Sequence, residues 1–143
     1  YGLCLGYAYQ IIDDVLDFVA DEELLGKTIG NDLIQGNITL PVIIALKDPE
    51  LGPSLRKLLE NNEITSDLIP QIIRKIETTG AFNESIRRAR FFLQSGLDII
   101  AELPQSLVRK KLQDLSVFIL NNYYEKTNKN IILEDIECQV LPT

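Results

Sequence analysis

One stretch near the beginning of the chain, YAYQIIDDVLDFV (residues 7–19), limits the possible folds most strongly. This segment is too apolar to be exposed to solvent on all sides and too acidic to be buried on all sides. On a helix that turns about 100° per residue, its polar side chains share one arc of about 100°, and apolar side chains fill the remaining circumference. The residues of this arc are Gln10, Asp13, Asp14 and Asp17. Such a helix must be surrounded by protein and face a cavity or a ligand along one stripe.

The three carboxylates of this stripe predict a binding site for a cation. Asp13, Asp14 and Asp17 lie within about one helical turn, and they would raise one another's pKa values unless a positive charge neutralised them. Hard oxygen ligands suit Mg²⁺, which usually completes its shell with waters and substrate phosphates, so the expected ligand is a diphosphate. A solvated surface face is the alternative, but such faces mix charges over half the circumference. The glycine and glutamate spacing of a calcium-binding loop is missing.

Helix signals continue along the chain and strand signals are almost absent, so we expect an all-α fold. Pro41 is compatible with a first helical turn, and Pro104 separates the last two helices as an antiparallel hairpin would require. Thr65 or Ser66 is the predicted cap of the fourth helix, and Gly80 its end. The expected helices cover residues 1–20, 38–48, about 53–61, about 66–79, 83–103 and 105–124. A loop carrying Gly26, Gly30 and Gly36 joins the first two.

The first helix has no capping residue before Tyr1, and Gly2 and Gly6 are spaced for close contact with another helix. We therefore expect a piece of a larger helical domain. Residues 125–143 show no clear period and are expected to form an appended arm.

Composition limits the kinds of partner and environment that we expect for this chain. A chain of 143 residues with 45% hydrophobic residues can bury a core, whereas its net charge of −7 argues against nucleic acid. Apolar stretches fall short of the roughly 18 residues needed to span a bilayer, so we expect a soluble protein with no transmembrane segment. Cys4 and Cys138 have neither zinc-site nor disulfide-framework spacing and are expected to be packing residues.

The segments YQIIDDVLDF and LGKTIGNDLIQGNITLP together resemble the second aspartate-rich region of the trans-polyprenyl diphosphate synthases, the family of farnesyl, geranylgeranyl and solanesyl diphosphate synthases. The likeness joins an aromatic-Gln pair, D-D-x-x-D, G-K, G-x-D-L and G-x-x-T-L-P. The later segment TTGAFNESIRRAR also follows the family pattern, so the resemblance covers residues 1–124. It implies the C-terminal part of an isoprenoid-synthase helical bundle.

The resemblance also implies a reaction, the head-to-tail 1′-4 condensation of an allylic diphosphate with isopentenyl diphosphate to a polyprenyl diphosphate. Asp13, Asp14 and Asp17 would hold Mg²⁺ against the allylic diphosphate, and Gln10 would lie beside the same ligand. Lys27 matches a diphosphate-binding lysine, and Asp32 matches a substrate-side aspartate next to it. Asp13, Asp14, Asp17 and Lys27 are thus the expected catalytic residues.

The chain departs from the family pattern in two ways. Asn37 stands where many relatives have a lysine or arginine, and the 143 residues contain neither the first aspartate-rich motif nor the arginine pair for isopentenyl diphosphate. We therefore expect this chain to be inactive alone, and to associate as a homodimer, with an N-terminal half or with a partner subunit. The alternative functions are a non-catalytic regulatory subunit of a heteromeric synthase and a helical interaction module without a ligand. The compartment stays open between cytoplasm, mitochondrion and plastid.

Overall fold

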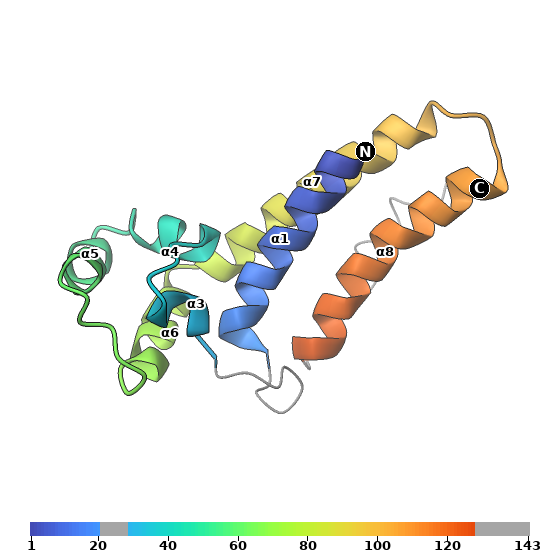
Figure 1. Ribbon diagram of the computed structural model, residues 1–143. Coiled ribbons are helices and arrows are strands. Elements are labelled where there is room, and N and C mark those ends of the chain that lie inside the picture. Colours follow the sequence, from blue (N-terminus) through green and yellow to red (C-terminus); the bar gives the residue numbers. More distant parts are fainter. Residues whose placement is uncertain (21–28, 128–143) are drawn as a thin grey trace.

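The computed structural model describes residues 1–20 and 29–127, and every regular element in them is an α-helix (Figure 1). This confirms the predicted all-α class. The helices are α1 (Gly2–Val19), α3 (Asn31–Ile34), α4 (Leu40–Ala45), α5 (Gly52–Glu60), α6 (Ile69–Thr78), α7 (Ala81–Ala101) and α8 (Leu107–Thr127).

Three long helices form one end of the molecule. Helix α1 packs against α7, and α8 lies alongside both (Figure 1). The pair α1 and α7 is antiparallel, because the ring of Tyr7 lies 5.2 Å from that of Phe92 while the ring of Phe18 lies 5.6 Å from that of Phe82. Helix α8 runs back along α7 after the turn that contains Pro104, as the predicted hairpin requires, and α1 packs against both helices (Figure 1).

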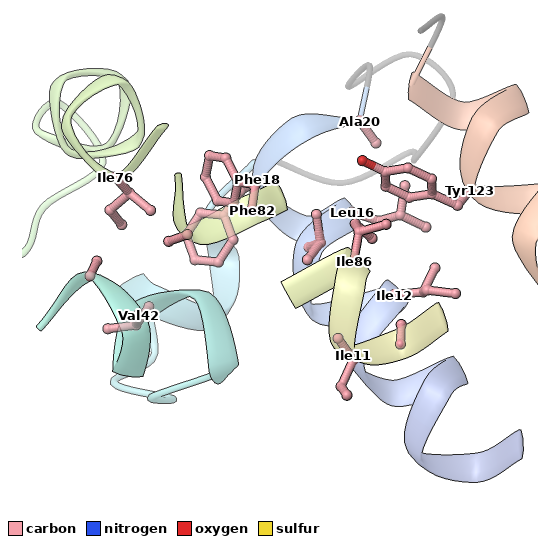
Figure 2. Close-up of a cluster of buried hydrophobic side chains, with 14 of the residues drawn as sticks. Ile11, Ile12, Leu16, Phe18, Ala20, Val42, Ile76, Phe82, Ile86 and Tyr123 are labelled. Atoms are coloured by element: carbon pink, nitrogen blue, oxygen red, sulfur yellow. The ribbon is translucent and has the colours of Figure 1, made fainter. Parts of the chain in front are cut away.

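The core explains why the apolar circumference of α1 is so wide. Figure 2 shows Leu16 and Phe18 of α1 among Phe82 and Ile86 of α7, with Tyr123 of α8 closing one side. Val15 of α1 is completely buried, and Leu16 and Phe18 are each 2% exposed. At about 25 cal/mol per Å² of buried apolar surface, each such side chain stabilises the fold by roughly 1.5–3 kcal/mol.

The short helices gather at the other end of the α1 and α7 pair (Figure 1). Helix α4 packs on α7, α1 and α6, and Val42 and Ile76 join the same core as the long helices (Figure 2). Pro41 lies in the first turn of α4, as predicted, and Gly80 ends α6 in a left-handed conformation with φ 73°.

Three local expectations differ from the structure. Helix α6 begins at Ile69, with Leu68 and not Thr65 or Ser66 at its cap position, because Pro70 fits the first turn of a helix. Helix α3 was not expected inside the loop that follows α1. Gly2 and Gly6 are exposed, and in the described part of the chain no atom lies within 4 Å of a Cβ added at either.

Gly96 of α7 makes the close helix contact instead. A Cβ added there would lie 3.2 Å from Cβ of Cys4 and 3.3 Å from the ring of Tyr1. The Tyr1 hydroxyl donates a hydrogen bond of 2.5 Å to the carbonyl oxygen of Leu112 in α8. The first residues of α1 are therefore fastened to both neighbouring helices. Half-buried Cys4 packs here, as expected, while Cys138 lies outside the described residues.

Candidate functional site

The three aspartates of α1 lie in three different environments, although they follow one another within a single turn. Asp13 is exposed, Asp17 is half-buried and Asp14 is only 9% exposed. Their difference comes from the segment 30–40, which folds back onto one edge of the polar stripe.

The side chain of Gln10 holds Asp14. Nε2 of Gln10 donates a hydrogen bond to Oδ1 of Asp14 at 2.8 Å, and the backbone N–H of Leu40 at the start of α4 favours the charged form of this carboxylate. Burial raises the pKa of the Asp14 carboxyl above its ordinary value. The negative charges of Asp32 and Asp13 raise this pKa further, whereas the hydrogen bond from Gln10 and the backbone N–H of Leu40 lower it.

Asp17 binds the beginning of the segment 30–40. Its Oδ2 accepts the backbone N–H of Asp32 at 3.1 Å, and its carbonyl oxygen accepts the N–H of Gly30 at 2.6 Å. Oδ1 of Asp32 in turn accepts Nδ2 of Asn37 at 3.2 Å. The carboxylate of Asp17 thus receives a backbone N–H from the first turn of α3, which is where helices leave such donors unsatisfied.

Glycine allows the segment 30–40 to take this path. Gly30 has φ 69° and Gly36 has φ 80°, a left-handed conformation that residues with a Cβ rarely adopt. A Cβ at Gly30 would also lie 2.6 Å from Cγ2 of Ile69 in α6. Gly30 therefore lets the segment pass closely between α1 and α6.

The structure brings together most of the residues that the sequence singled out. Gln10, Asp14 and Asp32 interact with one another directly or through their charges, Asp17 bonds the backbone of Asp32, and Asp13 lies exposed beside them. Lys27 lies outside the described residues. Sequence reasoning missed the backbone hydrogen bond from Asp32 to Asp17, for which side-chain patterns gave no signal.

A cation fits this arrangement only with help from a ligand. In residues 1–20 and 29–127, no three acidic, histidine or cysteine side chains come together as a metal-binding group. The carboxylate of Asp17 already accepts a backbone N–H, and that of Asp14 accepts the side-chain N–H of Gln10. Mg²⁺, however, is commonly bound through one or two carboxylates with waters and substrate phosphates. Asp13 and Asp17 lie one turn apart on the same face of α1, and their hard oxygens fit this smaller donor set.

An all-α bundle with a carboxylate stripe beside a glycine-containing loop defines a class, the isoprenoid synthases, and comparison with a solved structure bears this out. The crystal structure of heptaprenyl diphosphate synthase from Staphylococcus aureus superposes with a TM-score of 0.73 at 31% sequence identity. The match covers 81% of this chain and 36% of that one. The fold is therefore that of the isoprenoid synthases.

Sequence comparison gives the family. The family described as Polyprenyl synthetase matches residues 1–76. Heptaprenyl diphosphate synthase component 2 of Bacillus subtilis is 41% identical over 119 residues, which cover 83% of this chain and 34% of that protein. Chloroplastic solanesyl-diphosphate synthase 2 of rice is 36% identical, over 80% of this chain and 28% of that protein. The chain belongs to the polyprenyl synthetase family.

The chain spans about a third of the length of the curated relatives that it matches. Helices long and apolar enough to cross a membrane are not found in the described ranges, 1–20 and 29–127.

Proposed function

We propose that this chain supplies one carboxylate wall of a trans-polyprenyl diphosphate synthase. The observation that carries the proposal is the exposed carboxylate of Asp13 between the buried residues Ile12 and Asp14 of α1, with Asp17 one turn away on the same face. In the reaction, the C–O bond of an allylic diphosphate breaks, the double bond of isopentenyl diphosphate attacks the allylic carbon, and a proton is lost. The products are inorganic diphosphate and a polyprenyl diphosphate longer by one isoprenoid unit.

Each residue of the wall has a role in this proposal. The carboxylates of Asp13, Asp14 and Asp17 would face the allylic diphosphate, and those of Asp13 and Asp17 would hold Mg²⁺. The bound ion supplies positive charge for the leaving diphosphate. Gln10 fixes the carboxylate of Asp14 through its 2.8 Å hydrogen bond. On the resemblance, Lys27 would contact the diphosphate as a compact point charge, and Asp32 would lie on the substrate side.

The working enzyme needs more chain than these 143 residues. The first aspartate-rich motif and the arginine pair are not among them, and the matched region covers only 34% and 28% of two relatives. We assign residues 1–124 to the synthase domain and 125–143 to an appended arm. The complete site then requires an N-terminal half or another subunit, and this chain alone is catalytically inert.

A regulatory subunit is the second candidate function. Two relatives, from Bacillus subtilis and Geobacillus stearothermophilus, carry the name heptaprenyl diphosphate synthase component 2. That name indicates a synthase of more than one component. A regulatory subunit would assemble with a catalytic chain without using Asp13, whereas the enzyme requires this residue, so substitution of Asp13 distinguishes the two.

A chimera tests the proposal directly. Residues 1–124 of this chain would replace the matching part of rice solanesyl-diphosphate synthase 2, whose name carries no component number. Incorporation of labelled isopentenyl diphosphate into long-chain products would then be measured. We expect activity in the chimera and a loss of about a hundredfold or more in its Asp13→Asn variant, the size typical for removed electrostatic stabilisation. A helical, folded chimera whose activity did not depend on Asp13 would refute the enzyme reading.

A further inference from the structure

The turn that joins α7 to α8 carries a cluster of exposed apolar side chains. Residues 101–108 are all exposed, and four large apolar side chains at this turn leave between 46% and 69% of their surface open to solvent. They are Ile99, Leu103, Leu107 and Val108. Single apolar residues are common on protein surfaces, whereas a cluster of them marks a contact surface. We call residues 99–111 the hairpin tip.

Basic residues complete the hairpin tip at the beginning of α8. Arg109, Lys110 and Lys111 follow Val108 directly, and no ion pair of theirs is found within residues 1–20 and 29–127. Three cations and one acid, Glu102, give the tip a net charge of +2, whereas the whole chain has −7. The tip therefore differs in sign from the rest of the molecule.

Hydrogen bonds hold the hairpin tip in a defined shape. Nη1 of Arg109 donates to the carbonyl oxygen of Leu103 at 2.9 Å, and Oγ of Ser106 accepts the backbone N–H of Arg109 at 3.1 Å. The second bond caps the first turn of α8. Lys110 and Lys111 are both exposed, so their charges are available to a ligand beside the apolar cluster.

The hairpin tip lies far from the carboxylates of α1. A Cβ added at Gly96 of α7 would meet the ring of Tyr1, and the Tyr1 hydroxyl donates to the carbonyl oxygen of Leu112. The tip is therefore at the N-terminal end of α1, opposite the short helices (Figure 1). Asp13 lies about 18 Å further along the helix axis. A partner bound at the tip would leave the carboxylate stripe uncovered.

We propose that the hairpin tip docks on the surface of a bilayer that contains anionic lipids. Leu107 and Val108 enter the boundary between head groups and acyl chains, as apolar residues of interfacial segments do. Lys110 and Lys111 reach the negatively charged head groups on their long stems. The negative charge of the remaining surface opposes any other orientation on such a bilayer. Because the contact is peripheral, it needs no membrane-spanning helix, and it does not depend on the function of the carboxylate stripe.

Co-sedimentation with vesicles tests the electrostatic part. The 143-residue chain would be mixed with vesicles of phosphatidylcholine alone or of phosphatidylcholine with phosphatidylglycerol. We expect binding to the anionic vesicles, and its loss at about 1 M salt, where charges are screened within about 3 Å. Replacing Lys110 and Lys111 by Gln should weaken binding at least tenfold, since each lysine near an anionic surface contributes roughly a factor of five. Replacing Lys57 and Lys75 by Gln changes the charge equally on exposed positions of α5 and α6 and should leave binding unchanged.

A second pair of variants tests the apolar part. Leu107→Ser should weaken binding to the anionic vesicles about fivefold or more, because a leucine side chain is lost from the lipid boundary. Ile38→Ser removes a side chain that is 51% exposed at the other end of the molecule and should have no effect. Circular dichroism would check that every variant keeps its helices.

Three results would overturn the proposal. The unsubstituted chain could fail to bind anionic vesicles, the Lys57 and Lys75 variant could lose as much binding as the Lys110 and Lys111 variant, or Leu107→Ser could bind as well as the unsubstituted chain. If vesicles were ignored while Leu107→Ser changed the sedimentation of the chain without lipid, the tip would be a contact with another protein chain and not with a membrane.

Discussion

A methyl group at Gly30 would meet two obstacles at once. The backbone there has φ 69°, and the added Cβ would lie 2.6 Å from Cγ2 of Ile69. We expect Gly30→Ala to lower the free energy of unfolding by more than the roughly 1–2 kcal/mol that a left-handed backbone alone costs. Gly36→Ala is the matched control, because Gly36 has φ 80° and, among the described residues, no neighbouring atom lies within 4 Å of its added Cβ. Urea unfolding of both variants tests this, and equal losses would show that the contact with Ile69 is unimportant.

The ion pairs of Glu84 should make the stability of the folded protein depend on pH, and the direction of this dependence follows from the lowered pKa of Glu84. Hydrogen bonds from Arg88 and then Arg87 hold the pKa of the Glu84 carboxyl below its ordinary value. A lowered pKa in the folded state stabilises the protein above the unfolded-state pKa, and this contribution is lost as the pH falls through the lowered value. Glu84→Gln should therefore have a slightly lower Tm at pH 7, and the difference should vanish at about pH 2.

The control for Glu84 is Glu77→Gln on the exposed face of α6, where no ion pair is found among the described residues. A Tm difference for Glu84→Gln that stayed constant from neutral to acidic pH would mean that its ion pairs contribute nothing. The same ion pairs explain why Arg87 and Arg88 carry no catalytic role in the proposal.

At the scale of single residues, the sequence predicted the acidic stripe but not which of its aspartates are buried. Helical geometry places Gln10, Asp13, Asp14 and Asp17 on one arc, and the structure has all four on α1. Which of the aspartates is buried depends on where the segment 30–40 returns to α1. That contact includes the hydrogen bond from the backbone N–H of Asp32 to Asp17, which side-chain patterns do not reveal.

Helix packing provides a prediction at the scale of elements. Gly96 brings α7 against the first turn of α1, so a larger side chain there must push Tyr1 and Cys4 away. We expect Gly96→Leu to destabilise the fold by about 1–3 kcal/mol, as overpacking usually does. Gly6→Leu makes the same chemical change at a position where no neighbouring atom of residues 1–20 and 29–127 lies within 4 Å of an added Cβ, and it should stabilise the helix by about 0.5–1 kcal/mol because glycine weakens helix interiors.

Chemical unfolding of these two variants checks the prediction by the sign of the change. If Gly96→Leu and Gly6→Leu shifted the unfolding midpoint in the same direction, the contact between α1 and α7 would not depend on Gly96.

The elements themselves were predicted well where hydrophobic periodicity runs over many residues. The long helices α1, α7 and α8 fall close to the expected ranges, and Pro41 marks the first turn of α4 as expected. Short elements escaped the pattern. Helix α3 has four residues, too few for a period, and the start of α6 follows Pro70 and not the capping residues upstream. Gly2 and Gly6 looked like packing residues because spacing alone does not say which face of a helix meets a neighbour.

At the scale of the whole molecule, the described chain leaves large apolar side chains uncovered. Two of them, Leu3 at 75% and Phe91 at 68% exposure, lie on α1 and α7, and Phe118 at 65% lies on α8. The ring of Phe91 lies 5.9 Å from that of Phe92, which in turn contacts Tyr7, so aromatic surface extends across α1 and α7. Of the segment ITLPVIIAL, Pro41, Val42 and Ala45 are buried, whereas Ile38 and Ile43 stay exposed.

Exposed apolar surface of this kind predicts association, because soluble monomers rarely leave such patches uncovered. We expect the isolated chain to sediment as dimers or larger species at micromolar concentrations. Phe91→Asp should weaken self-association at least tenfold, since the loss of one buried aromatic side chain exceeds the roughly 1.4 kcal/mol that a factor of ten requires. Asn83→Asp adds the same charge at an exposed polar position of α7 and should leave association unchanged. Sedimentation velocity over a range of concentrations measures both effects. A chain that stayed monomeric at about 100 µM would show that these faces do not drive assembly in this segment, and the expected requirement for a second chain or an N-terminal half would then rest on the missing catalytic motifs alone.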